Sequence, residues 1–267
     1  MKADCHFHVY DPRFAPAFPG RRLEARATAA DYRAVQSRIG TQRSVVVQPA
    51  AYGTDNSVTL DAIAVLGRKR ARGIAVVHPE VSREELAHLD AGGIRGLRFS
   101  IHDPSTAAVS ADMIAPLAAR VAPLGWHVQL HLRADQIVAH ADLIRALPCP
   151  IVFDHMARLP LPEGLRHPAY AFVGALLDAG RAWVKLSGPY LESRDGAPGY
   201  ADAAVVAKAF ATRAPSRCVW GSDWPHPTER EGKPDDAALR ALLDDWVPDA
   251  QAREAVLASN PATLYGF

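Results

Sequence analysis

Cysteine is scarce in this sequence of 267 residues, and its three copies, Cys5, Cys149 and Cys218, lie far apart without a CxxC pair. An odd and scattered set excludes a disulfide framework and a cysteine-based zinc motif. Such a set is typical of a reducing compartment. We therefore expect a cytoplasmic protein.

An excess of charge of one sign is also lacking, because 30 Lys and Arg residues face 29 Asp and Glu residues. A net charge of +1 provides no global basic field for binding nucleic acid. The N-terminus has no basic region followed by an apolar run, and no run is long enough to span a bilayer. We expect neither nucleic acid nor a membrane as a partner, and the oligomeric state stays open.

Linkers and nucleotide motifs are missing as well. No Gly/Ser-rich stretch or block of charge divides the chain, and 49% hydrophobic composition is ample for one large core. No GxGxxG follows the first expected strand, which argues against a dinucleotide-binding fold. We expect a single domain over residues 1–267.

Eight short runs rich in β-branched residues are present, and stretches rich in Ala and Leu follow them. This alternation predicts a parallel α/β fold, and eight units favour a closed (β/α)8 TIM barrel over an open sheet. The insert Asp11–Ala27, rich in Pro and Arg, is expected to form a long loop over the barrel mouth. The expected strands are Ala3–His8, Ser44–Pro49, Gly73–His78, Ile94–Ser100, Trp126–Leu132, Pro150–His155, Ala182–Ser187 and Arg217–Asp223.

Helical patterns occupy the intervals between these strands. Ser82 and Glu85 form a capping-box pattern, and Ser110 suits an N-cap. One helix opens at Asp55-Asn56 and ends near Arg70. The others are expected at Ala111–Leu124, Ala134–Leu147, Pro168–Ala179, Ala201–Arg213, Asp235–Trp246 and Ala250–Ala258.

Chemistry-bearing side chains gather at the expected strand ends. In a strand alternate residues share a face, so His6 and His8 should project side by side, with Asp4 below them and Cys5 facing the helices. Two imidazoles aimed at one point can bind a divalent metal or polarise a carbonyl. In a barrel of this kind the carboxyl ends of the strands share one rim. The full set at that rim is His6, His8, His131, His155 and Asp223, which indicates a catalytic centre.

Other polar residues have two interpretations. Lys185 is expected to neutralise a buried acid, and Arg98 to pair with an internal carboxylate or to bind an anion. Gln48 and Tyr190 could contact substrate hydroxyl groups. Structural roles are favoured for His78, His102 and His226.

The HxH pair, the histidines of strands five and six and the aspartate of strand eight resemble the amidohydrolase superfamily, of the amidohydrolase 2 type. The segments VFDHMARLP, VKLSG, WGSDWPHP and SNPATLYGF are similar to its branch of 2-pyrone-4,6-dicarboxylate lactonases, sugar-acid lactonases and lactone isomerases. This resemblance covers nearly the whole chain.

The resemblance implies a somewhat distorted barrel that hydrolyses a small lactone, often a carboxylated one. It implies that Asp223 acts as a general base toward water, that His6, His8 and His155 polarise the carbonyl without a metal, and that Arg98 binds a substrate carboxylate. Two further arginines of the pyrone-dicarboxylate enzyme are absent here. Residues 101–104 and 189–192 stand at their places, which argues against a dicarboxylate substrate.

A second departure concerns His131, which replaces a tyrosine and restores a metal-ligand position of the superfamily. Two routes stay open: a metal-free site, or one divalent cation, preferably Zn²⁺, on His6, His8, His131 and Asp223. Without an ion, His131 joins Arg98, Gln48 and Tyr190 as a substrate-binding residue. The lack of a lysine at the end of strand four argues against two metals.

The main hypothesis is therefore a hydrolase that opens a small carboxylated or sugar-acid lactone by attack of water. One alternative keeps the site but changes the reaction, to a metal-dependent decarboxylation or a lactone isomerisation. Another alternative is a non-catalytic barrel that only binds a ligand.

Overall fold

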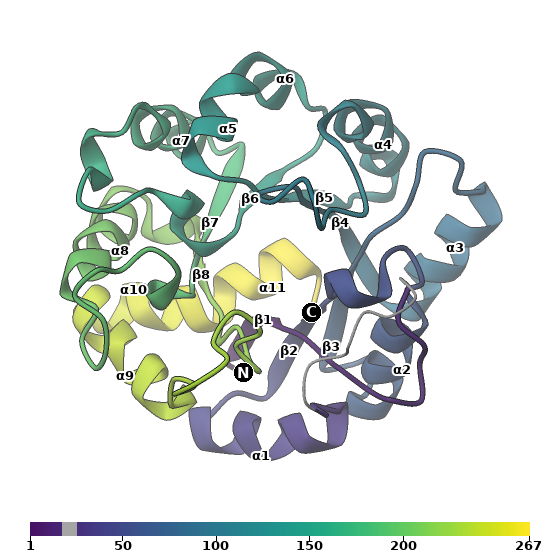
Figure 1. Ribbon diagram of the computed structural model, residues 1–267, viewed down its shortest axis with the longest axis horizontal. Coiled ribbons are helices and arrows are strands. Elements are labelled where there is room, and N and C mark those ends of the chain that lie inside the picture. Colours follow the sequence, from purple (N-terminus) through teal and green to yellow (C-terminus); the bar gives the residue numbers. More distant parts are fainter. Residues whose placement is uncertain (18–25) are drawn as a thin grey trace.

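Eight parallel strands form a ring in the computed structural model, which describes residues 1–17 and 26–267 (Figure 1). Each strand pairs with the next in chain order from β1 to β8. The ring closes through the segment after β8, where Phe7 bridges Trp224 and the His8 N–H donates to Trp224 O over 2.7 Å. The predicted (β/α)8 barrel is confirmed, and this indirect closure is its distortion.

The strands lie where the sequence indicated, but of the eight only β4 has its full expected length, and β6 and β8 are shortened most. Expected β6 and β8 reached His155 and Asp223, whereas both residues have left-handed backbones with φ of 50° and 63°. A strand cannot include that conformation, so both side chains are carried by the loops that follow. The strands are β1 Ala3–Phe7, β2 Arg43–Val47, β3 Ala71–Ala75, β4 Ile94–Ser100, β5 His127–His131, β6 Ile151–Phe153, β7 Ala182–Leu186 and β8 Cys218–Trp220.

Helices surround the ring, as Figure 1 shows. None within residues 1–17 and 26–267 is long and apolar enough to cross a bilayer. Ser82 caps α3 by accepting from the Glu85 N–H, whereas the Ser110 side chain caps no helix. The helices are α1 Ala29–Ile39, α2 Ser57–Leu66, α3 Arg83–Gly92, α4 Ile114–Val121, α5 Ala134–Ala139, α6 Ala141–Ala146, α7 Pro168–Asp178, α8 Ala201–Arg213, α9 Asp236–Trp246, α10 Ala250–Glu254 and α11 Asn260–Tyr265.

Several expected helices differ from those observed. The one expected at 111–124 is α-helical only over α4, between 3₁₀ turns at Ala111–Met113 and Ala122–Leu124, and the one expected to end near Arg70 ends at Leu66. The one expected at 134–147 divides into α5 and α6 at His140, whose φ of −104° and ψ of 19° depart from helical geometry. The one expected at 250–258 continues through a π-helical turn at Ala255–Ser259 into α11. In α11, the Tyr265 side chain packs with Val45, Val47 and Val219 inside the barrel. The barrel is therefore filled from that end, and its opening lies at the carboxyl ends of the strands.

A β-bulge in β1 corrects the expected facing of Asp4 and Cys5. The register of β1 against β2 shifts between Asp4 and Phe7, so one extra residue is accommodated there. Cys5 consequently packs inside the barrel with residues of several strands. Asp4 faces the helix layer instead, where it accepts a hydrogen bond of 2.8 Å from the Tyr32 hydroxyl.

The long loop at 11–27 is only partly covered by the described residues. Its base closes where Tyr10 and Ala27 pair as an antiparallel bridge. Ala17 N–H donates to Ala51 O over 2.9 Å, and Ala51 lines the pocket described below. Residues 18–25 lie outside the described residues, so the covering of the mouth by this loop stays a prediction.

Candidate active site

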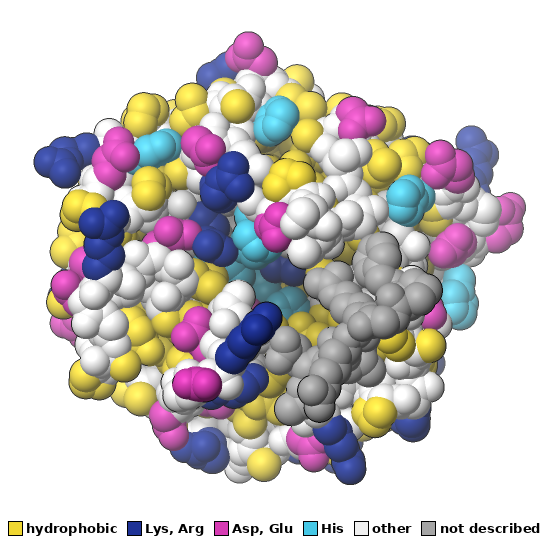
Figure 2. Space-filling view, in the orientation of Figure 1, with side chains coloured by type: hydrophobic (Ala, Val, Ile, Leu, Met, Phe, Trp, Pro, Cys, Tyr) yellow, Lys and Arg dark blue, Asp and Glu magenta, His cyan; other side chains and the backbone are white. Residues whose placement is uncertain are grey.

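A pocket of about 240 Å³ opens at the carboxyl ends of the strands. In Figure 2 it is the central hollow, where histidine and arginine side chains are visible. Of the residues expected at the site, five line it: His8, Arg98, His131, His155 and Asp223. Ser100, His102, Tyr10, Thr106 and Thr228 line it as well.

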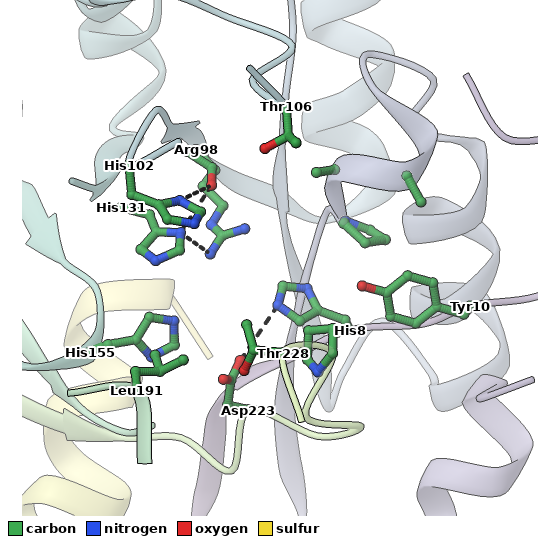
Figure 3. A pocket seen from close by; sticks show the side chains of 15 residues that line it. His8, Tyr10, Arg98, His102, Thr106, His131, His155, Leu191, Asp223 and Thr228 are labelled. Carbon is green, nitrogen blue, oxygen red and sulfur yellow. Dashed lines mark hydrogen bonds and ion pairs between the residues drawn. The ribbon is translucent and has the colours of Figure 1, made fainter. Parts of the chain in front are cut away.

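Four of the expected residues form one group, which we name the Asp223 cluster: His6, His8, His155 and Asp223 (Figure 3 shows the last three). His6 Nε2 and His8 Nε2 lie 3.2 Å apart, and each lies 3.5 Å from Asp223 Oδ1. The His155 ring lies 4.7 Å from that of His6, centre to centre. All four side chains are buried. Residues from opposite ends of the chain thus meet at one point.

Strained backbone holds this cluster in place. His155 begins a run of four non-glycine residues, 155–158, whose φ values are 50°, 53°, 60° and 48°. Asp223 has a φ of 63° and His226 one of 56°. Each left-handed residue of this type costs about 1–2 kcal/mol, and such strain typically persists at functional sites. Two separate segments of this kind converge on the same pocket.

Neighbouring groups determine the proton positions on two imidazoles. His8 Nδ1 lies 2.8 Å from Val47 O, which can only accept, so Nδ1 carries the proton. In neutral His8 the Nε2 atom therefore has a free lone pair directed at Asp223 and His6. His155 Nδ1 lies 3.0 Å from the Ser187 hydroxyl, which can donate to it and leave the proton on Nε2.

Burial and neighbouring charges have opposing effects on the pKa values of Asp223 and His155. Burial on its own would raise the pKa of Asp223, but the surrounding imidazoles, His155 foremost, hold it well below its usual range. Burial lowers the pKa of His155 to about 4, although Asp223 and Asp154 oppose this. Burial also lowers the pKa of His6, and the Lys185 ammonium adds to that effect. At neutral pH the cluster thus contains the Asp223 carboxylate beside the neutral imidazoles of His6 and His155.

The buried Asp154 contacts both His6, a member of the Asp223 cluster, and Arg98, which lines the pocket outside that cluster. Lys185 Nζ lies 3.5 Å from Asp154 Oδ1, so the lysine neutralises a buried acid, as expected. Arg98 Nε donates to Oδ2 over 3.1 Å, and His6 Nδ1 lies 3.4 Å from Oδ1. Both alternatives for Arg98 are compatible with this geometry, because Arg98 pairs internally through Nε and still lines the pocket.

The opposite wall, which we name the Arg98 cluster, consists of Arg98, Ser100, His102 and His131 (Figure 3). His131 Nδ1 lies 2.9 Å from Ser100 Oγ and 3.2 Å from Arg98 Nη2. His131 Nε2 lies 3.1 Å from Nη1 of Arg158, whose Nε donates to Glu192. Hydrogen-bonding groups thus surround both ring nitrogens of His131. This differs from the expected ligand set, since His131 belongs to neither of the two groups that could hold a metal ion among the residues that the structure describes.

One of those two groups fits a single ion. Ligands about 2.1 Å from a tetrahedral zinc ion lie about 3.4 Å from one another. The separations within His6, His8 and Asp223, 3.2 and twice 3.5 Å, match that spacing. The other group, His6, Asp154 and His155, contains the Lys185 ammonium 3.2 Å from His6 Nδ1, which disfavours a second cation.

Two residues that the sequence predicts to bind substrate, Gln48 and Tyr190, make their side-chain hydrogen bonds to other parts of the protein. The Gln48 side chain donates to Gly53 O and Asp55 O and accepts from Thr59, so all of its polar atoms hold the loop after β2. Tyr190 donates to Asp223 Oδ2 over 2.7 Å. Neither residue lines the pocket. These contacts assign Gln48 to the scaffold and Tyr190 to the candidate base.

Sequence reasoning gave His102 a structural role, yet it lines the pocket, and its ring lies 4.0 Å from that of His131. A signal was present, because His102 continues the alternation of Arg98 and Ser100 along β4. Tyr10, Thr106 and Thr228 come from loops, where spacing carries no such information.

Comparison with known proteins agrees with this geometry. The family model described as Amidohydrolase matches residues 3–267. This chain belongs to the amidohydrolase family. A 4-sulfomuconolactone hydrolase of Rhizobium radiobacter is 32% identical to this amidohydrolase over 98% of the chain and 89% of the relative. A 2-pyrone-4,6-dicarboxylate hydrolase of Comamonas testosteroni is 33% identical, with the same two coverages. A D-galactarolactone isomerase of Agrobacterium fabrum is 32% identical over 98% and 90%.

Solved structures share the whole barrel. An apo crystal structure from Agrobacterium tumefaciens superposes with a TM-score of 0.90 at 30% identity and covers 100% of this amidohydrolase and 94% of that chain. A probable 2-pyrone-4,6-dicarboxylic acid hydrolase from Acinetobacter baumannii, solved with citric acid, gives 0.85 at 27% identity and covers 100% and 99%. The resemblance expected from the sequence is confirmed at the level of family and fold.

Proposed function

We propose that this amidohydrolase opens a small lactone bearing an acidic group, by attack of water on the ester carbonyl. The observation that carries the proposal is the Asp223 cluster, in which a buried carboxylate faces several imidazoles at the pocket wall. The named activities of its relatives, two lactone hydrolases and one lactone isomerase, support the same substrate class.

Asp223 is the general base in this proposal. Its Oδ1 atom faces the histidines, and its lowered pKa keeps it ionised at neutral pH, ready to accept a proton from water. The barrier to lactone opening then depends on stabilising the charge that develops on the carbonyl oxygen.

His155 is the best-placed donor to that oxygen. Its Nε2 can carry a proton while the Ser187 hydroxyl donates to Nδ1, and the ring lines the pocket. The contacts around His8 differ, because its Nδ1 atom donates to Val47 O, which leaves Nε2 without a proton to donate whenever the ring carries a single proton. We therefore assign His6 and His8 to holding the attacking water or an ion, and carbonyl polarisation mainly to His155.

An ion also fits the site, held by His6, His8 and Asp223. A bound Zn²⁺ would act as a Lewis acid and lower the pKa of water to about 7. Its presence can be tested by metal analysis of the purified protein together with activity before and after chelation. Activity that survives complete removal of metal would exclude a required ion.

The Arg98 cluster provides the substrate-binding wall. Arg98 presents a guanidinium at the pocket, and His102 and Thr106 add polar contacts. One guanidinium suits one acidic group, either a carboxylate or a sulfonate. Sugar-acid lactones, which combine one carboxylate with hydroxyl groups, satisfy this arrangement as well.

The test is a panel of acidic lactones assayed at constant pH by titrating the protons released. Hydrolysis of a neutral ester to an acid releases one proton per turnover, whereas isomerisation releases none. The relative named as a D-galactarolactone isomerase makes isomerisation the second candidate. Mass spectrometry separates the outcomes: addition of water, an unchanged mass, or the loss of CO₂ expected from a decarboxylase. Tight binding without any product across the panel would contradict the proposal and favour a binding protein.

A further inference from the structure

A tyrosine outside the pocket occupies one oxygen of the candidate base. Tyr190 lies in the short 3₁₀ turn Pro189–Leu191 after β7, and its hydroxyl donates to Asp223 Oδ2 over 2.7 Å. The other oxygen, Oδ1, is the one that His6 and His8 approach at 3.5 Å. The two oxygens of this carboxylate therefore have different partners.

Behind the tyrosine lies a buried chain of two more polar residues. His226 Nδ1 lies 3.0 Å from the Tyr190 hydroxyl, and His226 Nε2 lies 3.1 Å from Asp236 Oδ1. His226 is 2% exposed and Asp236 7% exposed, so water competes little for these contacts. Asp236 is the first residue of α9, where the helix dipole favours a carboxylate.

These hydrogen-bonding groups come from separate parts of the sequence. The hydrogen-bonded series of Asp236, His226 and Tyr190 joins the start of α9, the loop after β8 and the turn after β7, and it ends on Asp223. His226 has a left-handed φ of 56°, so the loop accepts strain to present this imidazole. Buried polar chains are costly unless every member is satisfied, which argues that this one is retained for the carboxylate at its end.

We propose that Tyr190, supported by His226 and Asp236, is a positioning residue that fixes the rotation of the Asp223 carboxylate and reserves Oδ1 for the reacting water. This inference rests on the proposed role of Asp223 as the base. It applies whether or not an ion is bound, because either route uses Oδ1.

The physical reason lies in the torsion of the carboxylate. Rotation about the terminal bond of an aspartate has a broad energy profile, so a carboxylate held on one side only samples many orientations. A hydrogen bond to Oδ2 selects one orientation, and His226 selects the position of the tyrosine. A misdirected base raises the barrier to reaction without weakening substrate binding on the opposite wall.

The experiment compares Tyr190→Phe with Tyr170→Phe, a change of the same kind on α7, far from the pocket. We expect Tyr190→Phe to lower kcat by about 10- to 100-fold with KM within twofold of wild type, because misplacement of a catalytic group by about 1 Å can cost 100-fold. Tyr170→Phe should retain wild-type kinetics. A kcat for Tyr190→Phe within twofold of wild type would overturn the proposal.

Asp236→Asn provides a second variant, remote enough to fold if the first does not. We expect it to lower kcat in the same sense but less, by about 3- to 10-fold, because it acts through two intervening groups. Its control is Asp235→Asn on the same helix end, since asparagine caps a helix as well as aspartate does. In the double variant with Tyr190→Phe, Asp236→Asn should have no further effect on kcat. Independent, multiplying effects would contradict a chain that acts through the tyrosine.

Failure of this inference is distinguishable from failure of the proposed function. If Asp223→Asn is inactive and Tyr190→Phe is fully active, Asp223 is the base but needs no positioning. If the wild type opens no lactone, the crystal structure of Tyr190→Phe still decides: a rotated Asp223 carboxylate supports positioning, and an unchanged one excludes it.

Discussion

Two walls of the same pocket hold their charged side chains in different surroundings. In the Asp223 cluster a carboxylate is surrounded by imidazoles, and two of its four residues, His155 and Asp223, have a left-handed backbone. In the Arg98 cluster Arg98, Ser100 and His131 lie on the regular, paired strands β4 and β5, and hydrogen-bonding groups surround the His131 ring. In the proposed function, the first wall accepts a proton and the second wall binds an anionic group.

This difference teaches which kinetic constant each wall should control. Groups that act on the reacting atoms change kcat, whereas groups that hold a non-reacting part of the substrate change mainly KM. A single variant on one wall that changes the kinetic constant expected for the other wall would contradict this comparison.

The largest effect is expected for Asp223→Asn. The amide keeps the shape of the side chain but cannot accept a proton from water, so kcat should fall by at least about 1,000-fold. Substrate affinity, measured by calorimetry with the inactive variant, should stay within a few fold of the wild-type KM. Asp178→Asn, at an exposed ion pair with Arg213, is the matched control. Wild-type turnover of Asp223→Asn would refute the assignment of the base.

A smaller loss of turnover is expected for His155→Phe. The ring volume is kept while the donor to the carbonyl oxygen is removed, which should lower kcat by about 100- to 1,000-fold. Steady-state kinetics with KM and kcat separated provide the measurement. A change confined to KM would place His155 on the binding wall instead.

Arg98→Lys tests the other wall. Lysine keeps the positive charge beside Asp154 but loses the planar fork that binds an acidic group in two places, so KM should rise by about 10- to 100-fold. Turnover at saturating substrate should change by less than fivefold. Arg95→Lys, on the same strand but paired with Asp90, is the control and should match wild type. A loss confined to kcat would mean that Arg98 serves the chemistry.

The smallest effect concerns stability in acid. Burial lowers the pKa of His155 to about 4 in the folded state, from its ordinary value of 6.5. A depressed basic pKa means that the unfolded chain binds more protons, so stability is full above pH 6.5 and is lost as pH falls toward 4. His155→Phe lacks this titrating group. Between pH 7 and pH 4 its free energy of unfolding should therefore fall by about 3 kcal/mol less than that of the wild type, at 1.36 kcal/mol for each unit of pKa. Urea unfolding of both proteins at pH 7 and pH 4 measures it, and equal slopes with pH would contradict the neutral His155.

Much of the fold was predictable because its signals are local. The strand β4 and the helix α8 match the expected ranges to the residue, since apolar patterning and propensity act within a few positions. The ends of β6 and β8 were placed too late, because His and Asp adopt a left-handed backbone more often than most residues but still too rarely for the residue type to indicate it at His155 and Asp223. Tertiary contacts impose that conformation against local preference.

The sequence predicted which residues meet at the candidate site better than it predicted what each of them contacts. His6, His8, His155 and Asp223 meet as expected, because parallel strands bring their carboxyl ends to one rim. Gln48 and Tyr190 were assigned to substrate, but their partners, a loop backbone and the candidate base, depend on side-chain directions within loops. His131 was expected among the ligands, whereas Arg98 and Arg158 contact its ring from distant positions in the chain.

The sequence by itself determined the number of strand–helix units, the barrel they form and the residue types at its rim, because periodicity and composition act along the chain. Only the tertiary structure decided which way each of these residues faces. The bulge in β1 turns Cys5 inward and Asp4 outward, Val47 O selects the proton position on His8, and Tyr190 selects the free oxygen of Asp223. Each of these outcomes depends on a hydrogen-bond partner many residues away, which no local pattern specifies.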